Sequence, residues 1–318
     1  MYKSILAIGL AITFLQACGT SKNKEIEDYV EVEEDFLGDE EVVEEESILI
    51  EQPVYRATET VLSDLVHTKL EVNFDWEKSR MNGIATITAK PHFYTTDSLV
   101  LDAKGMDINS VSMNGKPRPF DYDDAFLRIA LDKAYTKNEK YTVVIDYVAK
   151  PEERKTGGSA AITSDKGLYF INPKNEQPGH KPHIWTQGET EASSVWFPTI
   201  DAPNAKTSQE ILMTVQDKYI TLSNGKLIGS KKNADGTRTD HWKQELPHAP
   251  YLFMMAVGEF AIVKDSYTKK DGTVIPVNYY VEKEWEQYAK DIFGETPAMI
   301  AHFSEQLGVE YPLSLIHI

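Results

Sequence analysis

The sequence contains a single cysteine, Cys18, among its 318 residues. One cysteine cannot form a disulfide bond within the chain, so an apolar core must stabilise the folded part. Material for such a core is present, because 41% of the residues are hydrophobic and 10% are aromatic. Length and composition therefore predict two globular domains or one large one.

Positive charge is missing from residues 25–51, which contain fourteen Asp and Glu and no Lys or Arg. Nearly all of the formal net charge of -17 therefore lies in this segment. Like charges at this density oppose compaction, so we expect residues 18–57 to form an acidic, disordered tether. The segment lacks the ligand spacing of an EF-hand loop, which favours a solvated spacer over a calcium site. The remaining chain has no basic stripe, which argues against nucleic-acid binding.

Self-contained catalytic motifs are also missing. The sequence has no His-Glu-x-x-His, Gly-x-Ser-x-Gly, Walker-type or Gly-x-Gly-x-x-Gly pattern. A zinc-protease helix, a hydrolase nucleophile elbow and a nucleotide-binding loop therefore have no support in the sequence. His180 and His183 lie three residues apart, but Pro178 and Pro182 beside them indicate a loop. Because no further potential ligand lies nearby in sequence, we interpret them as ordinary loop histidines rather than metal ligands.

The N-terminus has the pattern of an export signal. Lys3 precedes an apolar stretch, Ile5–Leu15, that is too short to span a bilayer as a helix, and Leu15-Gln16-Ala17-Cys18 follows. This ending resembles a bacterial lipobox, in which the cysteine is lipidated and becomes the mature N-terminus. We expect residues 1–17 to be a lipoprotein signal peptide. Cys18 would then anchor the protein to a lipid membrane of the cell envelope, at the outer membrane and facing the periplasm or the exterior. A plain secretory signal with a chance cysteine is the alternative.

Alternating apolar residues predict strands from Lys69 onward. Segment 69–76 places Leu70, Val72, Phe74 and Trp76 on one face, and segment 83–90 continues the pattern after a turn at 77–83. Further strands are predicted at 98–103, 108–116, 125–132, 140–149, 210–229 and 239–246. Segment 251–263 has enough continuous apolar length for a strand buried on both faces. The pattern predicts a mainly β fold, an antiparallel sandwich or saddle-shaped sheet.

The pattern changes after segment 275–281. Apolar residues then recur at helical spacing through residue 312: Trp285, Tyr288, Ile292, Met299, Ile300, Phe303 and Leu307. Gly294 and Pro297 mark the join between two predicted helices, and we expect a second domain to begin at about residue 259.

The chain then stops in an apolar run. One reading frame of CTGTCTCTTATACACATC encodes Leu313–Ile318 and resembles a transposon end used in sequencing libraries. We therefore expect residues 313–318 to be adapter sequence after a frame cut near Pro312, which would leave His317 without a chemical role.

The segment WTQGETEASSVWFPTIDAP, residues 185–203, is the most specific one in the chain. Together with SNG at 223–225 it resembles the aminopeptidase N family of zinc metallopeptidases, the gluzincin aminopeptidases, in their Thr-Gln-x-Glu and Phe-Pro segment. Segments 67–90, 251–260 and 282–312 resemble the same family in the same order, so the resemblance covers residues 66–312. It implies an N-terminal β domain at 58–258, followed at 259–312 by the first strands and helices of a thermolysin-like α+β catalytic domain.

The resemblance gives roles to two residues. Gln187 would line the pocket for the first substrate side chain, and Glu189 would bind the free α-amine of a peptide substrate. A carboxylate suits that role, because the terminal amine has a pKa of about 7.7–8.0 and carries positive charge at neutral pH. The alternative is that both side chains point outward from an edge strand and are solvated. We expect Trp196 and Phe197 to be core residues.

The segment departs from the family pattern Phe-Pro-Cys-x-Asp-Glu-Pro at Thr199 and Ala202. These departures concern the subfamily and its specificity, and the turn should survive them, because Asp201 can accept backbone hydrogen bonds and Pro203 fixes φ.

The resemblance also implies chemistry that this sequence does not contain. In the full-length family a zinc ion activates water, a glutamate of His-Glu-x-x-His acts as general base and a tyrosine stabilises the oxyanion. We therefore expect an N-terminal fragment of an exported zinc aminopeptidase that is truncated before the zinc motif, holds neither metal ligands nor catalytic residues, and is inactive alone. The alternative is a non-catalytic surface lipoprotein whose β-sandwich binds protein or glycan.

Overall fold

The computed structural model describes residues 60–155, 157, 164–311 and 315–317. The predicted signal peptide, Cys18 and the acidic tether lie outside these residues. Residues 58–318 group into one compact unit. Within the described part of this unit, no helix is long and apolar enough to cross a membrane.

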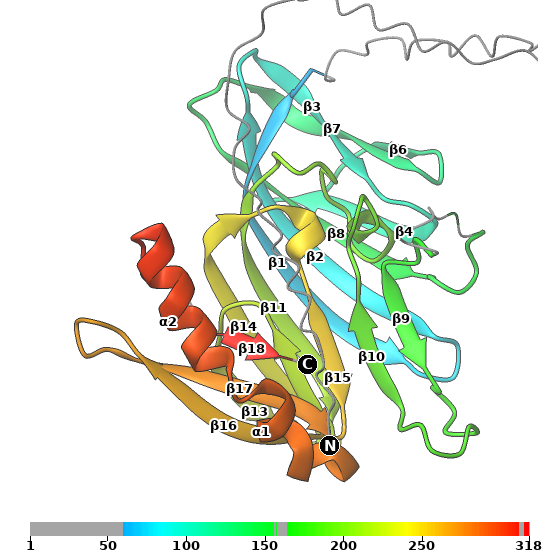
Figure 1. The fold of residues 1–318 in the computed structure, drawn as a ribbon. Helices are drawn as coiled ribbons and strands as arrows, with labels where there is room; N and C mark the ends of the chain where they lie inside the picture. Colours follow the sequence, from blue (N-terminus) through cyan, green and yellow to red (C-terminus); the bar gives the residue numbers. More distant parts are fainter. Residues whose placement is uncertain (1–59, 156, 158–163, 312–314, 318) are drawn as a thin grey trace, which may run out of the picture. The chain divides into compact units, whose positions relative to one another are not determined.

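The largest sheet has eight strands in the order β13-β14-β11-β1-β2-β8-β4-β5 (Figure 1). Neighbouring strands run antiparallel, except that β1 and β11 pair in parallel. The strands are β1 (Ser63–Asp75), β2 (Arg80–Pro91), β4 (Met106–Met113), β5 (Lys116–Pro117), β8 (Tyr141–Ala149), β11 (Thr207–Gln216), β13 (Lys226–Lys232) and β14 (Thr237–His248). The sheet confirms the predicted mainly β, antiparallel fold class.

The first hairpin shows how the sequence pattern produces the sheet. Leu70 and Val72 of β1 are buried, whereas Glu71 between them is exposed, because successive side chains point to opposite faces. The predicted turn at 77–83 is too long: the turn covers residues 76–79, and Arg80–Gly83 belong to β2. The reason is Met81, which is fully buried and pairs with Phe74, so the alternation of β2 already begins there.

A second, four-stranded antiparallel sheet has the order β12-β15-β10-β9. Its strands are β12 (Ile220–Ser223), β15 (Met255–Gly258), β10 (His183–Thr186) and β9 (Leu168–Ile171). All four residues of β15 are buried, as predicted for a strand covered on both faces. The single strand predicted at 251–263 is wrong, however. Pro250 opens the 3-10 helix η2 (Pro250–Leu252) ahead of β15, and the next strand starts only at Phe260.

One apolar cluster joins the two sheets. It combines side chains of the large sheet with side chains of the small sheet, such as Leu70, Ile87, Ile145 and Ile211 with Ile184, Leu222 and Ala256. A third sheet, β3-β7-β6, adds Leu99, Leu101, Leu127 and Ile129 to the same cluster. Its strands are β3 (Thr96–Asp102), β6 (Phe120–Tyr122) and β7 (Phe126–Tyr135). The layers therefore share one core, as expected for packed sheets.

A second, smaller core forms after Gly258. Strands β16 (Phe260–Thr268) and β17 (Val274–Glu282) pair antiparallel, and β18 (Leu315–His317) pairs with β17 in parallel. The segment between β17 and β18 forms the 3-10 helix η3 (Lys283–Tyr288), α1 (Ala289–Phe293) and α2 (Thr296–Leu307), shown in orange to red in Figure 1. The predicted join at Gly294 is confirmed. The pairing of β18 does not test whether Leu313–Ile318 is adapter sequence.

The apolar side chains that predict these helices are mostly exposed. Only Ile300 is buried, whereas six others are between 45% and 73% exposed: Trp285, Tyr288, Ile292, Met299, Phe303 and Leu307. Monomeric soluble proteins rarely leave so many large apolar side chains of one segment in water. The spacing therefore identifies the helices correctly, but most of the apolar face has no cover among the residues that the structure describes.

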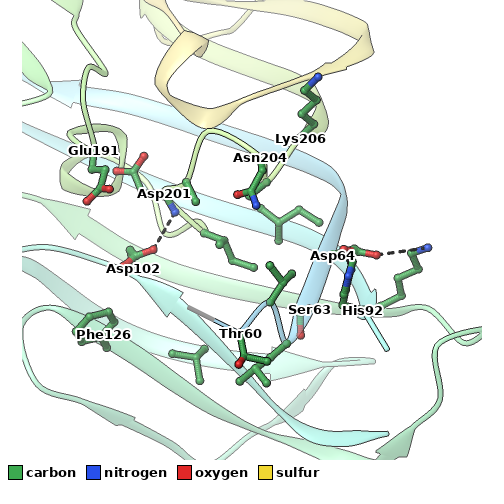
Figure 2. A pocket seen from close by; sticks show the side chains of 18 of the residues that line it. Thr60, Ser63, Asp64, His92, Asp102, Phe126, Glu191, Asp201, Asn204 and Lys206 are labelled. Carbon is green, nitrogen blue, oxygen red and sulfur yellow. Dashed lines mark hydrogen bonds and ion pairs between the residues drawn. The ribbon is translucent and has the colours of Figure 1, made fainter. Parts of the chain in front are cut away.

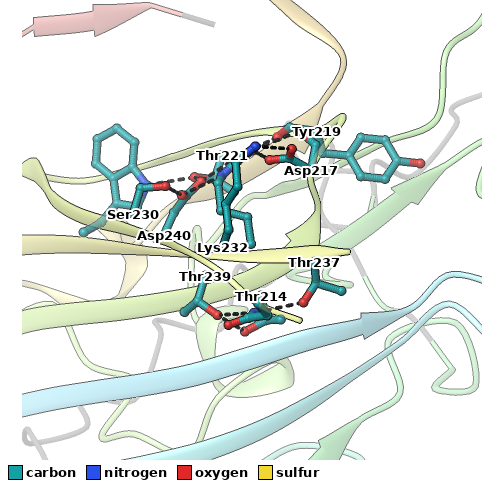
Figure 3. Close-up of polar contacts among 12 residues, drawn as sticks. Thr214, Asp217, Tyr219, Thr221, Ser230, Lys232, Thr237, Thr239 and Asp240 are labelled. Carbon is teal, nitrogen blue, oxygen red and sulfur yellow. Dashed lines mark hydrogen bonds and ion pairs between the residues drawn. The ribbon is translucent and has the colours of Figure 1, made fainter. Parts of the chain in front are cut away.

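A buried charge cluster ties the large sheet to the small one (Figure 3). The side chain of Asp240 in β14 is only 4% exposed and lies 2.8 Å from Arg238 Nε. It also accepts hydrogen bonds from the hydroxyls of Ser230 (2.6 Å) and Thr221 (2.7 Å), which belong to β13 and β12. Every partner of this carboxylate is a donor, which is the condition for burying a charge without a large penalty.

Candidate substrate-binding loop

The predicted site residues lie in the loop that leaves strand β10. The strand ends at Thr186, whose hydroxyl accepts a hydrogen bond from the Met255 amide at 3.0 Å. Residues 187–192, which we call the Gln187–Glu189 loop, then turn away from the sheet toward the 3-10 helix η1 (Ser193–Val195). Gln187 and Glu189 therefore lie at a strand end and not along an edge strand, which contradicts the alternative that both are strand residues.

The two residues contact each other through a local hydrogen bond. The Glu189 amide donates to Gln187 Oε1 at 2.7 Å, while the Gln187 amide donates to the Gly167 carbonyl at 2.9 Å. Glu189 is exposed and Gln187 is half-buried, and the Glu189–Thr190 peptide bond is cis. The carboxylate of Glu189 thus faces solvent from a backbone position that the side chain of Gln187 helps to fix.

Close packing supports the loop from one side. A Cβ atom at Gly188 would lie 2.4 Å from the Tyr251 carbonyl oxygen and 2.6 Å from Ser193 Oγ, so only glycine fits there. The hydroxyl of Ser193, which is fully buried, donates to the Pro250 carbonyl at 2.8 Å. The loop therefore rests directly on the backbone of η2.

Gly167 and Lys104 also contact the Gln187–Glu189 loop. Gly167 has a φ of +69°, and a Cβ atom there would lie 2.0 Å from the Ala192 carbonyl oxygen. The ammonium group of Lys104 donates to the Glu191 carbonyl at 2.7 Å. The Ala192 amide donates to the Gly188 carbonyl at 2.9 Å, which closes the loop on itself. Contacts from three separate parts of the chain thus define the path of the Gln187–Glu189 loop.

The aspartate turn after the loop behaves as predicted. Asp201 is buried, and its Oδ2 accepts a hydrogen bond from the Ser194 amide at 2.8 Å. Its own amide donates to Asp102 Oδ2 at 2.8 Å, beside a backbone bridge between Asp102 and Thr199. Burial raises the pKa of Asp201, against the lowering effect of the Ser194 amide and the Lys104 charge. The turn therefore fastens the segment to the end of β3.

The aromatic residues of the segment are core residues, as predicted. Trp196 and Phe197 are fully buried, and the Phe197 ring stacks on Phe253 with centroids 5.1 Å apart. His248 also packs on Phe253, with the two ring centroids 4.6 Å apart. Burial lowers the pKa of His248. Apolar packing therefore anchors the C-terminal half of the segment, while its N-terminal half reaches the surface.

A pocket of about 700 Å³ is lined in part by the aspartate turn, at Ile200, Asp201 and Ala202. Figure 2 shows Asp102 joined to Asp201 on one wall, and Asp64 beside His92 on another. Glu191 lines this pocket, but neither Gln187 nor Glu189 does. The pocket is therefore a separate feature from the exposed surface around Glu189.

His180 and His183, the two histidines weighed as metal ligands, lie in a loop and at the start of a strand. His180 is exposed in a loop, and His183 opens β10 with its Nδ1 2.9 Å from the Lys181 carbonyl oxygen. Within residues 60–155, 157, 164–311 and 315–317, no group of three His, Cys, Asp or Glu side chains is arranged to hold a metal ion. Cys18, the predicted lipidation site, lies outside the described residues.

Comparison with known proteins identifies the family. Residues 64–252 match the family model of the peptidase M1 N-terminal domain. The chain belongs to the peptidase M1 family. This confirms the resemblance to the aminopeptidase N family, to whose N-terminal domain the Gln187–Glu189 loop and the aspartate turn belong.

The similar proteins are longer than this chain. Aminopeptidase N of Haemophilus influenzae is 28% identical over 188 residues, which are 58% of this chain and 20% of that protein. Transcription initiation factor TFIID subunit 2 of Danio rerio is 23% identical over 226 residues, 61% of this chain and 19% of that protein. The chain thus spans about a fifth of the length of these two relatives.

A solved structure shares the M1 fold. The crystal structure of an M1 zinc metallopeptidase mutant from Deinococcus radiodurans, bound to a Tyr-Ser-Ala substrate, matches with a TM-score of 0.68 and 17% identity. The match covers 80% of this chain and 55% of that one. At this identity the likeness shows the fold, and the roles of Gln187 and Glu189 stay predictions.

Proposed function

We propose that this chain is the N-terminal part of an exported zinc-dependent aminopeptidase that removes single residues from the N-termini of peptides. Membership of the M1 family supports the enzyme class. The observation that carries the proposal further is the position of Glu189, an exposed carboxylate on a loop whose backbone is held from both sides.

In this proposal Glu189 binds the α-ammonium group of the substrate. An enzyme that removes one residue at a time must recognise the end of the peptide, and that end carries positive charge at neutral pH. A carboxylate on a fixed backbone sets the distance between the terminal amine and the bond to be cleaved. Gln187 contributes in two ways: its Oε1 accepts the Glu189 amide, and its half-buried side chain contacts the first substrate residue.

The described residues do not fit a zinc site, because they include no group of three potential ligands arranged around one point. We therefore propose that the zinc ligands and the catalytic residues belong to a longer form of the protein. Residues 1–318 alone should bind substrate weakly and hydrolyse nothing. The β domain supplies the contacts to the α-amine and to the first side chain.

Export and membrane attachment are also part of the proposal. They rest on the sequence pattern at the N-terminus, where Cys18 follows the apolar stretch Ile5–Leu15. A lipid on Cys18 and the acidic segment after it would hold the β domain at a distance from a membrane of the cell envelope. Metabolic labelling with a radioactive fatty acid tests this: the wild-type chain should be labelled and the Cys18→Ala variant should not. Label on both proteins, or on neither, would contradict a lipid at Cys18.

The function is tested on the protein produced from the complete genomic reading frame. We expect about one zinc ion per chain and hydrolysis of amino-acid anilides that a chelator abolishes, whereas N-acetylated anilides are not cleaved. The chain of residues 1–318 is the matched control and should be inactive. Absence of a His-Glu-x-x-His motif from the complete frame, or absence of hydrolysis by a zinc-loaded protein, would refute the enzyme.

A second candidate is a non-catalytic surface lipoprotein whose β-sandwich binds protein or glycan. One observation favours this non-catalytic candidate. A relative that matches 61% of the chain, TFIID subunit 2, is not named as a peptidase, so similar sequences also occur in proteins that are not named as peptidases. The same reading frame separates the candidates. A complete frame without the zinc motif, together with capture of a protein or glycan by residues 60–311, would favour the binding protein.

A further inference from the structure

The 3-10 helix η2, on which the Gln187–Glu189 loop rests, is itself held by two side chains at the end of β12. Asn224 donates from Nδ2 to the Leu252 carbonyl at 3.0 Å and accepts from the Met254 amide at Oδ1 at 2.8 Å. Ser223 donates its hydroxyl to the Met254 carbonyl at 2.7 Å. These three bonds fix the backbone where η2 continues into β15.

The residue after Asn224 explains why this asparagine stays in place. Gly225 has a φ of +84°, and a Cβ atom there would lie 2.0 Å from the Lys243 carbonyl oxygen. Only glycine allows the chain to pass so close to β14 with this backbone conformation. The tripeptide Ser223-Asn224-Gly225 therefore forms one unit: a serine and an asparagine that bind the backbone of residues 252–254, and a glycine that lets them reach it.

The contacts continue from this unit to the predicted substrate-binding residue. Asn224 holds Leu252 and Met254, the Tyr251 backbone packs on Gly188, and the Pro250 carbonyl accepts the Ser193 hydroxyl. Gly188 directly precedes Glu189. A movement of η2 would therefore move the backbone that carries the Glu189 carboxylate.

We propose that Asn224 is a positioning residue for Glu189, acting through η2 and Gly188 and touching no substrate. The identity of Glu189 as the substrate ligand rests on the proposed function. The positioning itself does not, because it concerns only how β12, η2 and the Gln187–Glu189 loop hold one another. A structural readout can therefore test it without catalysis.

The experiment compares Asn224→Ala with Asn233→Ala in the full chain. Asn233 is a matched control, because it is also half-buried and its side chain also has two hydrogen-bond partners: Asn233 Nδ2 donates to the hydroxyls of Thr237 (2.9 Å) and Thr239 (3.1 Å). Hydrogen exchange of the Glu189 and Ala192 amides, both hydrogen-bonded within the loop, reports on its stability. Amides of the β1–β2 hairpin report on the remaining fold.

We expect Asn224→Ala to accelerate exchange at Glu189 and Ala192 about tenfold, as the loss of two hydrogen bonds predicts, and to leave the β1–β2 amides unchanged. Asn233→Ala should leave the loop amides unchanged. Asn224→Asp keeps the acceptor for the Met254 amide and should show a smaller acceleration. This milder variant also allows the test if Asn224→Ala does not fold. Unchanged loop amides in Asn224→Ala, or equal acceleration of all amides, would overturn the proposal.

A kinetic readout on the complete protein links the positioning to the function. Asn224→Ala should raise KM for amino-acid anilides about tenfold with a smaller change in kcat, whereas Asn233→Ala should change neither. An unchanged KM alongside accelerated loop exchange would overturn the step from loop to substrate. A complete protein without any activity would instead refute the proposed function, and the exchange result would still decide the role of Asn224.

Discussion

Replacing Asp240 with alanine should destabilise the protein strongly. The Asp240 side chain is 4% exposed, and the Arg238 guanidinium beside it is 16% exposed, so the substitution leaves a largely buried charge without its main partner. Removing one member of a buried ion pair costs about 3–5 kcal/mol. Arg238 keeps the Tyr219 carbonyl and Asp217, at 2.6 Å and 3.1 Å, so we expect the lower end, about 3 kcal/mol.

Urea unfolding followed by tryptophan fluorescence measures this loss. Trp242 is a local reporter, because its Nε1 donates to Thr221 Oγ1 in the same cluster at 3.0 Å. Asp217→Ala is the control: it removes an exposed partner of Arg238 and should cost far less. A loss below about 1 kcal/mol for Asp240→Ala, or equal losses for the two variants, would refute the view that this buried charge cluster ties the sheets together.

Three further predictions concern the core and its pH dependence. Phe197→Ala removes a fully buried ring that stacks on Phe253 and should cost about 3–5 kcal/mol in urea unfolding; a loss below about 1 kcal/mol would mean that the site collapses around the gap. Tyr147→Phe should leave stability unchanged or raise it by about 1 kcal/mol, because the buried Tyr147 hydroxyl has no hydrogen-bond partner among the residues that the structure describes; a clear loss would reveal a partner. Burial raises the pKa of Asp240, but hydrogen bonds from Arg238, Ser230 and Thr221 outweigh it, so the net pKa lies below the ordinary 3.8. Stability from this group is therefore present above that value and lost as the pH falls through the lowered pKa, and unfolding of Asp240→Asn should depend less on pH in this range than that of the wild type.

The strands could be predicted from the sequence because burial on one face imposes an alternation that the sequence displays directly. Leu70 and Val72 are buried where the alternation predicts it, and Trp196 and Phe197 are core residues as expected. The turn after β1 was predicted too long, because the polar residues between Trp76 and Met81 gave no sign that pairing resumes at Arg80. Helical spacing located α2, but spacing alone carries no information on what covers Met299 or Phe303.

The resemblance to a known family identifies the candidate site. The contacts that hold the Gln187–Glu189 loop could not be predicted from the local sequence. Gln187 and Glu189 stand in a recognisable segment, yet the groups that hold them come from distant parts of the chain: the Gly167 backbone, the Lys104 ammonium and η2. No spacing rule connects these positions, because the fold alone brings them together. Asn224 was visible only as part of the SNG tripeptide, without a physical role.

The most direct test of the account is the contribution of Glu189 to hydrolysis of substrates with a free amino terminus. In the complete protein, Glu189→Ala should lower kcat/KM for amino-acid anilides by about 10- to 100-fold, the value expected for losing a hydrogen bond to a charged group. Glu191→Ala, which removes an exposed carboxylate two residues further along the same loop, should leave kcat/KM nearly unchanged. Equal kcat/KM for wild type and Glu189→Ala would contradict the central claim that Glu189 recognises the substrate amine.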